Sequence, residues 1–268
     1  MSTDAASPAS TLLWADLERD VIDVSGADAL TFLHSQLAND INTISIGETV
    51  HSLLLEPAGH VVALVRVVRH DEDLVTLDVE HGYGEIVIAR LSKFVLRAKV
   101  SMVLSSKKVR AVRGHDAWAM TTSSVVGSLV ISRPWWNDPD AADVIALDDE
   151  LPQVGEHVDA VTIDTCRVDA GWPRMGVDIQ SGDIPAATGV LAVAVSFSKG
   201  CYPGQELVER MDSRGTVAPV VLRAFHVGDE MNNIDVTSRG QQCVLARVKR
   251  NDVRGAELQS LWHSPSSN

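Results

Sequence analysis

Apolar and polar residues alternate in short blocks along the first part of the chain, which predicts short strands and two helices. Residues 21–24 predict a strand that ends at Ser25, where the hydroxyl is placed to cap a helix with Asp28 as its capping-box partner. The apolar stripe of this helix stops near Asn39 and is formed by Leu30, Leu33 and Leu37. The chain therefore begins with a strand and an amphipathic helix.

The next apolar blocks have the length and composition of strands. Residues 50–56 and 60–69 predict two strands around a Pro/Gly turn, and residues 74–79 predict a third. Residues 85–99 carry apolar side chains at helical spacing and predict a helix. Hairpins interrupted by helices favour an α+β fold over a doubly wound parallel sheet.

The second part of the chain predicts a strand and a helix up to Gly215, and mainly β-strands after it. Residues 191–197 predict a buried strand, and a helix is expected from Pro203 to Gly215, because proline suits a first helical turn and glycine a last one. Residues 220–227 and 242–249 then read as β-like runs. We therefore expect a disordered tail at residues 1–10, a main folded region at 11–215, and a small β unit with a disordered end at 216–268.

The charge and the cysteine content narrow the possible functions. The 268 residues carry a net charge of −13, which argues against a general electrostatic grip on nucleic acid or on an anionic membrane. Residues 1–10 lack the features of a signal peptide, and no apolar run approaches the roughly 20 residues of a spanning helix. Three widely separated cysteines, without a C-x-x-C pair, indicate a reduced compartment and no self-contained metal site. These features predict a cytoplasmic protein.

The run SKGCYPGQE, residues 198–206, is the strongest candidate for chemistry. Cys201 lies just ahead of the predicted helix, where unpaired amides favour an anion such as a thiolate, and Lys199 would add to that effect. Gly200 and Gly204 leave room for a ligand to approach the backbone. The polar side chains that follow are placed to hydrogen-bond a polar heterocycle: Gln205 and Glu206.

Each of these features also has a purely structural interpretation. A tight turn before a helix needs glycines, a cysteine is often just a small buried residue, and Lys199 could simply be solvated. Trp172 could face a ligand channel or fill the core, and the neighbouring pair Trp135 and Trp136 could stack on a planar ligand or cover an interface. Arg167 could pair with an acid across the fold or meet a carboxylate of a ligand.

Several segments together resemble the YgfZ branch of the GcvT-like folate-binding family. Residues 199–206 match its signature K-G-C-[FY]-x-G-Q-E at every specified position. Residues 24–28 resemble its opening strand-to-helix segment, and residues 55–60 resemble its D-P-x-G-[RK] turn. Residues 167–173 are similar to its R-x-E-A-G-x-P segment, and residues 184–188 to the I-P-x-A-T that precedes the signature. The resemblance covers about residues 21–215 in order.

The resemblance implies two intertwined α+β lobes and a C-terminal β-barrel around a central channel that accepts tetrahydrofolate or a one-carbon derivative. It implies a monomer that supports iron-sulfur cluster assembly or repair, with iron-sulfur proteins as partners and an indirect effect on tRNA modification. On this basis Cys201 and Lys199 are the expected catalytic residues. The expected folate-binding residues are Gly200, Tyr202, Gln205, Glu206, Arg167 and Trp172.

Two departures from the family shape these expectations. Aminomethyltransferases of the glycine cleavage system carry acids in the strand after the Pro/Gly turn and after the I-P segment, whereas residues 61–69 contain no acid and Ala187 stands at the second position. Only 53 residues follow Gly215, so the barrel is expected to be shortened. The alternatives are a folate-dependent aminomethyltransferase or methyltransferase, which is the expected activity if the chain is an enzyme, and a scaffold without chemistry.

Overall fold

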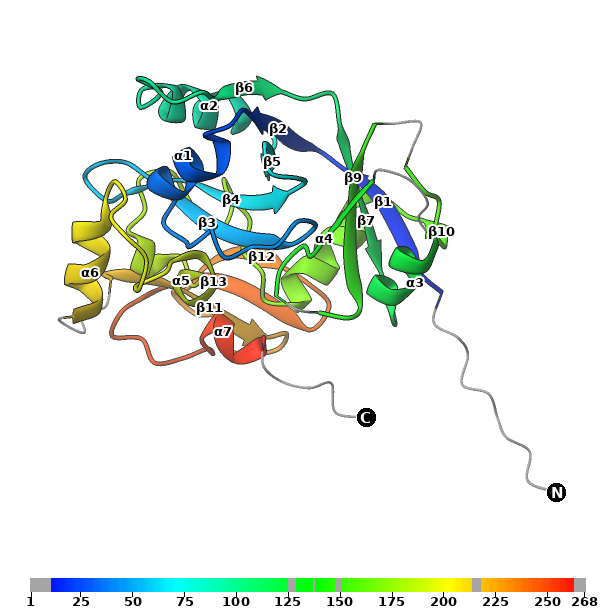
Figure 1. Ribbon diagram of the computed structural model, residues 1–268. Helices are drawn as coiled ribbons and strands as arrows, with labels where there is room; N and C mark the ends of the chain where they lie inside the picture. The colour runs from blue at the N-terminus through cyan, green and yellow to red at the C-terminus, as the bar shows by residue number, and fades with distance from the viewer. Residues whose placement is uncertain (1–10, 125–128, 137, 148–150, 214–217, 263–268) are drawn as a thin grey trace.

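The computed structural model describes residues 11–124, 129–136, 138–147, 151–213 and 218–262, and the predicted disordered ends lie outside these ranges. The described residues form three open β-sheets with short helices between and around them (Figure 1). The predicted α+β class is confirmed. Among the described residues, no helix is both long enough and apolar enough to span a membrane.

The first sheet has five antiparallel strands in the order β3-β4-β5-β2-β6. They are β2 (Arg19–Ser25), β3 (Thr49–Leu55), β4 (Val61–Arg69), β5 (Leu74–Glu80) and β6 (Ser101–Leu104). Helices α1 (Ala29–Gln36) and α2 (Gly84–Ser92) pack their apolar stripes against this sheet. β4 is an almost unbroken apolar run because both of its faces are buried, which is the composition that a covered central strand requires.

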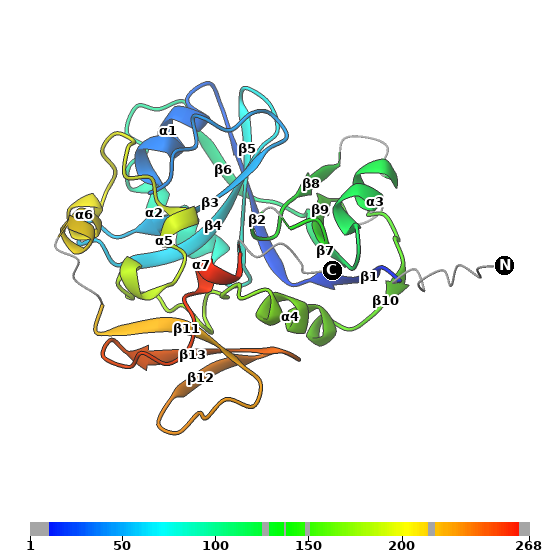
Figure 2. The same cartoon turned by 90° about the horizontal axis from the view of Figure 1, so that it is seen from below.

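The second sheet also has five strands, in the order β10-β1-β7-β9-β8. They are β1 (Leu13–Leu17), β7 (Lys108–Arg113), β8 (Val130–Ser132), β9 (Ala141–Ala146) and β10 (Glu156–His157), with α3 (Ala117–Ser124) and α4 (Ala160–Asp169) beside them. The chain starts in this sheet with β1, crosses into the first sheet with β2, and returns at β7, as Figure 2 shows. The two lobes are therefore intertwined, as predicted.

The third sheet contains only three antiparallel strands, in the order β11-β13-β12. They are β11 (Val220–His226), β12 (Asp235–Arg239) and β13 (Cys243–Lys249). This sheet is open, so the C-terminal unit is a shortened, barrel-like remnant rather than a closed barrel. The 3₁₀ turn η2 (Pro185–Ala187) and α7 (Leu258–Leu261) contact β11 of this sheet, whereas α5 (Leu191–Ala194) contacts β3 of the first sheet and α6 (Gln205–Ser213) contacts η2.

Three local predictions were wrong. The strand expected at 191–197 is not formed, and its first four residues are helix α5 instead, because a short apolar run does not distinguish the two and the carbonyl of Val190 accepts bonds from two later amides. The helix expected at 85–99 stops at Ser92, where tight turns redirect the chain toward β6. The capping box at Ser25 is absent, since α1 begins after Asp28, whose carboxylate accepts the amide of Lys99 instead.

A buried network of ion pairs joins the first and second sheets. Asp78 on β5 accepts from Arg19 and Arg66, and Arg66 also donates to Asp143 on β9 at 2.6 Å. Arg113 on β7 pairs with the same Asp143 at 2.9 Å. Both carboxylates are almost fully buried, so each depends on its arginine partners to offset the cost of leaving water.

Replacing Asp78 by Asn should destabilise the protein strongly. The substitution removes the charge that compensates two buried guanidinium groups, and breaking such a buried pair costs about 3–5 kcal/mol. Urea unfolding measures this loss. Glu206→Gln, which breaks only the exposed pair with Arg210, should leave the free energy of unfolding almost unchanged. Equal effects of the two substitutions would contradict the role assigned to the network.

Candidate functional site

A cavity of about 640 Å³ lies between the two large sheets, with α4 and residues 172–177 on its wall. This volume falls within the range of about 300–1,000 Å³ that is usual for small-molecule sites. Its lining combines aromatic rings with charged and polar groups, among them His51, Arg66, Arg113, Trp135, Asp143 and Trp172. That a central channel passes here stays a prediction.

Aromatic side chains from distant parts of the sequence cluster beside this cavity, and His51, Trp135 and Trp172 line it. The Trp172 ring lies 4.6 Å from the His51 ring and 5.4 Å from Trp262, measured between ring centroids. Trp136 stacks on Trp262 at 5.8 Å and also contacts Trp135. Both interpretations of Trp172 from the sequence therefore hold, because this side chain lines the cavity and also belongs to the buried core. Trp135 lines the cavity and belongs to the same buried cluster as Trp172, and Trp136 packs against that cluster.

The buried charges fix the electrostatic character of the cavity. Burial favours the neutral form of Asp143, but Arg113 and Arg66 outweigh it and lower the pKa of this carboxyl below its usual value. Burial, together with the charges of Arg66 and Arg19, lowers the pKa of His51 to about 3, so the imidazole is neutral near pH 7. The Nε of Arg113 is buried and makes no hydrogen bond with a described residue, and the Arg113 side chain is among those that line the cavity.

Arg167 lines the cavity, but its hydrogen-bonding capacity is already used. Its five N–H groups reach both oxygens of Asp164, Asp178, the hydroxyl of Ser238 on β12, and the carbonyl of Trp172. These bonds join α4 to the third sheet, which favours the acid-pairing interpretation over a direct ligand contact. A neighbouring arginine is better placed for a ligand, because Arg174 lines the same cavity, is about one-third exposed, and uses one side-chain nitrogen for Asp164.

The other predicted site residues lie away from the cavity. None of Lys199, Gly200, Cys201, Tyr202, Gln205 and Glu206 lines it. Cys201 is exposed and lies four residues before α6, the helix at the left edge of Figure 1. Tyr202 is buried in the core cluster that also contains Trp172, and burial raises its pKa to about 12. The structure therefore separates the predicted site residues into two groups.

The Lys199 side chain binds the C-terminal end of helix α1. Its buried ammonium donates to the carbonyl oxygens of Leu37 at 2.6 Å, Asn39 at 3.1 Å and His34, at the C-terminal end of α1 where carbonyls lack helical partners. Burial lowers the pKa of Lys199 to about 8. No described contact joins this ammonium to the Cys201 thiol, so the predicted cation-thiolate pairing is not seen.

Two segments that the resemblance singled out pack directly against each other. A Cβ atom on Gly204 would lie 2.7 Å from the carbonyl oxygen of Glu56 and 2.9 Å from the Cα of Gly59. Gly204 also has a φ of +88°, in the left-handed region that glycine tolerates. The glycine therefore allows the start of α6 to dock on the turn between β3 and β4, rather than making space for a ligand.

Gln205 and Glu206 make contacts along α6 itself. The Gln205 amide donates to Glu209 at 2.6 Å, and Glu206 accepts from Arg210 at 2.9 Å. Both are i,i+4 contacts of the kind that stabilise a helix surface by a few tenths of a kcal/mol. Their predicted role toward a heterocycle stays a prediction, since it requires a ligand on this exposed surface rather than in the cavity.

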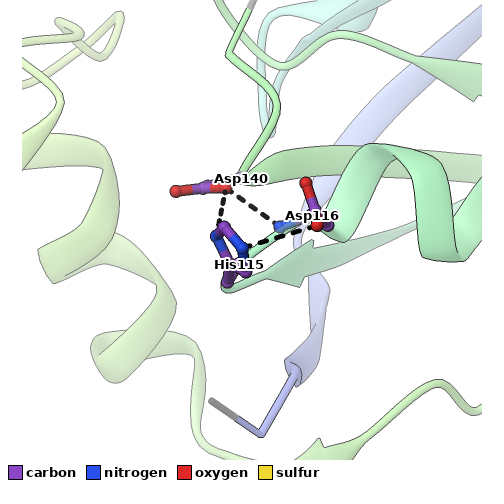
Figure 3. Close-up of side chains that lie close together, drawn as sticks. All are labelled: His115, Asp116 and Asp140. Carbon is purple, nitrogen blue, oxygen red and sulfur yellow. Dashed lines mark hydrogen bonds and ion pairs between the residues drawn. The ribbon is translucent and has the colours of Figure 1, made fainter. Parts of the chain in front are cut away.

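One exposed group of side chains among the described residues has the composition of a metal site. His115, Asp116 and Asp140 place one ligand atom each within 4.8 Å of the others, as Figure 3 shows. The Asp140 carboxylate already accepts the backbone amide of Asp116 at 3.0 Å, and its distance to the His115 Nδ1 is 3.7 Å. This arrangement is accounted for by a hydrogen-bonded turn before α3.

Comparison with known proteins supports the predicted resemblance. The chain is 29% identical over 197 residues to an uncharacterized protein of Haemophilus influenzae, covering 73% of the chain and 66% of that protein. It is 26% identical to the tRNA-modifying protein YgfZ of Enterobacter sp., covering 86% of the chain and 79% of the relative. For YgfZ of Escherichia coli the identity is 24%, with 72% and 65% covered. No protein-family model matches the chain.

The fold has a clear counterpart among solved structures. The glycine cleavage system aminomethyltransferase T of Bartonella henselae superimposes with a TM-score of 0.72 at 18% identity, covering 89% of this chain and 78% of that one. The fold is therefore GcvT-like. The sequence relatives and this fold together confirm that the chain resembles YgfZ-type proteins. The chain spans between about two thirds and four fifths of the length of these sequence relatives.

Gly204→Ala should destabilise the protein, whereas Gly200→Ala should not. Alanine at 204 meets backbone atoms of the β3–β4 turn and must adopt a positive φ, and strain of this kind costs roughly 1–3 kcal/mol. At position 200 no heavy atom lies within 4 Å of an added Cβ. Thermal and urea unfolding of both variants test this difference. Equal loss of stability in both would show that the docking contact is unimportant.

His51 should make stability fall with acidification. Its pKa drops from 6.5 to about 3 on folding, so between these values the unfolded chain binds more protons and the free energy of unfolding decreases as pH falls. The slope approaches about 1.4 kcal/mol per pH unit for one group. Asp143 affects the pH dependence of stability only at lower pH, because the pKa of this carboxyl in the unfolded chain is 3.8.

Urea unfolding of His51→Gln between about pH 7 and pH 5 should therefore show a flatter pH dependence than the parent chain. His60→Gln is the matched control, because the His60 side chain is exposed, and it should keep the parental slope. If His51→Gln retains the full slope, the imidazole is not buried as a neutral group.

Proposed function

We propose that this protein binds a reduced folate, either tetrahydrofolate or a one-carbon derivative, in the cavity between its two large sheets. The observation that carries the proposal is the aromatic and cationic lining of a 640 Å³ cavity in a GcvT-like fold. A pterin ring is planar and polar at its edge, so it suits a site that offers ring faces and hydrogen-bond donors together.

The cavity residues suit two parts of a folate, the ring system and the glutamyl tail. Trp172 offers an aromatic face for the ring system, and the unpaired Nε–H of Arg113 offers a donor to a ring oxygen or nitrogen. Arg174 takes the role that the sequence suggested for Arg167, because a partly exposed guanidinium can still donate to a carboxylate of the glutamyl tail. When bound, the folate supplies a carrier for a one-carbon unit.

The wider role that we propose is support of iron-sulfur cluster assembly or repair, with an indirect effect on tRNA modification. Similarity to proteins named tRNA-modifying protein YgfZ supports the link to tRNA. The net charge of −13 supports an indirect effect, since contact with a phosphate backbone relies on clustered positive charge. Iron-sulfur proteins are then the expected partners.

We propose a separate role for Cys201, toward a partner protein. Its thiol is exposed and lies outside the cavity, so it is better placed to meet a group on another protein than the ring of a bound folate. Lys199 supports this position by anchoring the turn to α1 through three backbone carbonyls. We therefore treat Lys199 as a positioning residue, and Cys201 as the residue that acts on a partner.

A folate-dependent aminomethyltransferase is the second candidate, favoured by the structural likeness to the glycine cleavage enzyme. Such chemistry needs a carboxylate able to exchange a proton near pH 7. Asp143 is a poor candidate, because two arginines lower its pKa and occupy its oxygens. Ala187, at the position of the family acid, is buried in the cluster beneath the third sheet. Neither position thus supports this transfer.

Calorimetric titration with tetrahydrofolate tests the proposal. Arg174→Ala should weaken binding about tenfold, equivalent to about 1.4 kcal/mol, because it removes the partner of the glutamyl carboxylate. Cys201→Ser should bind as tightly as the parent chain, because the thiol lies outside the cavity. Absence of binding at about 1 mM ligand would remove the folate claim, since affinity at that level is negligible.

The same titration distinguishes the two predicted groups of site residues. If Cys201→Ser weakened binding while Arg174→Ala did not, the ligand site would lie at residues 199–206 instead of the cavity. An assay of tetrahydrofolate-dependent aminomethyl transfer from a lipoyl carrier protein addresses the second candidate. Sustained turnover in that assay would rank the transferase above the binding function.

A further inference from the structure

One segment of this acidic protein has the opposite charge. Residues 86–115 contain eight of the 23 lysines and arginines and no Asp or Glu, in a chain whose net charge is −13. The segment covers the end of α2, the loop that follows it, and strands β6 and β7. Figure 1 shows α2, the loop and β6 along one edge of the molecule, far from the third sheet.

Exposed apolar side chains occupy the same segment. Leu96 is 87% exposed, and Ile86, Phe94 and Leu104 are each more than one-third exposed. Between them the basic residues Lys93, Arg97 and Lys99 are exposed, and none forms an ion pair with a described residue. We call this set of seven residues the α2–β6 surface.

The open edge of the first sheet lies beside this surface. β6 is the last strand in the order β3-β4-β5-β2-β6, and among the described residues it pairs only with β2. Its outer backbone groups therefore have no partner strand, which is a template for pairing with another chain. Leu104 contacts the region of Gly84 at the start of α2, which ties the edge to the apolar side chains.

We propose that the α2–β6 surface binds an acidic, strand-forming segment of a partner protein, which adds to the edge of β6. Backbone hydrogen bonds to β6 supply pairing, Leu96 and Phe94 supply apolar contact, and Lys93, Arg97 and Lys99 attract acidic side chains. An anionic membrane would meet the same side chains, but it would leave the β6 edge unpaired and would be repelled by the net charge. A partner segment of this composition satisfies all three features.

The proposal is tested by selecting peptides from a displayed random library against the full chain, and by titrating synthetic copies of the selected peptides. The expected peptides combine β-branched or aromatic residues with Asp and Glu. Arg97→Glu and Leu96→Asp should each weaken their binding at least about tenfold, which corresponds to about 1.4 kcal/mol. Raising the salt concentration should weaken it further, because exposed charges are screened.

Two matched substitutions on the C-terminal unit serve as controls. Val253 is 89% exposed and Arg250 is exposed, so Val253→Asp and Arg250→Glu make the same chemical changes elsewhere on the surface. Both should leave peptide binding unchanged. All four variants should keep the parental thermal unfolding midpoint, because none of the four side chains is buried.

Several outcomes would overturn the proposal. Selected peptides without acidic enrichment, or equal effects of the control and test variants, would contradict it. Binding to phosphatidylserine vesicles or to bulk tRNA that is lost in Leu96→Asp would assign the surface to a membrane or to RNA. A concentration-dependent dimer that Leu96→Asp abolishes, seen by analytical ultracentrifugation, would instead assign it to a second copy of this chain.

Discussion

The ion-pair network between the two large sheets is the interaction on which the rest of the structure depends. Asp78 and Asp143 are buried at the junction of the intertwined lobes, and Arg19, Arg66 and Arg113 converge on them. Because removing either carboxylate would leave buried charges without compensation, the two sheets are held at one relative position. The same arginines border the cavity, so one set of contacts fixes both the geometry of the lobes and the electrostatic character of the space between them. Burial, together with the charges of Arg66 and Arg19, keeps His51 neutral, and Arg113 and Arg66 keep Asp143 ionised, which makes the cavity better suited to holding a polar ring than to exchanging protons with it.

A second consequence of the fold is that the thiol and the cavity are separate. The signature at residues 199–206 attaches to the first sheet in two ways. Lys199 binds the carbonyls at the end of α1, and Gly204 packs against the turn at Gly59. Both contacts hold the motif at the surface, with Cys201 exposed. Lys199 and Gly204 thus have structural roles, while the Cys201 thiol is exposed. This division supports a protein that holds a small molecule in one place and meets a macromolecule in another.

Much of the first sheet could be predicted from the sequence, because its strands are short apolar runs separated by turns with glycine or proline. β3, β4 and β5 lie close to their expected bounds. The run at 191–197 could not be assigned in this way, since its helix α5 depends on local amides and on the Asn39 side chain, which donates to Val193 from far along the chain. Arg174 and His51 were also missed as cavity residues. The only available signal was the proximity of Arg174 to the segment 167–173, whereas His51 sits in an ordinary apolar strand.

The sequence alone determined the α+β class, the shortened C-terminal unit and the resemblance to YgfZ-type proteins, because these depend on local periodicity, chain length and short motifs. Only the tertiary structure decided which candidate residues share a site. Arg167 and Trp172 reach the cavity because α4 and the loop after it pack between the sheets, while Cys201 does not reach it. The roles of Lys199 and Arg167 were likewise settled by partners more than 70 residues away, since Lys199 binds α1 and Arg167 reaches Ser238 on β12. The type of a residue limits what its side chain can bind, but packing between segments distant in sequence determines which partner it meets.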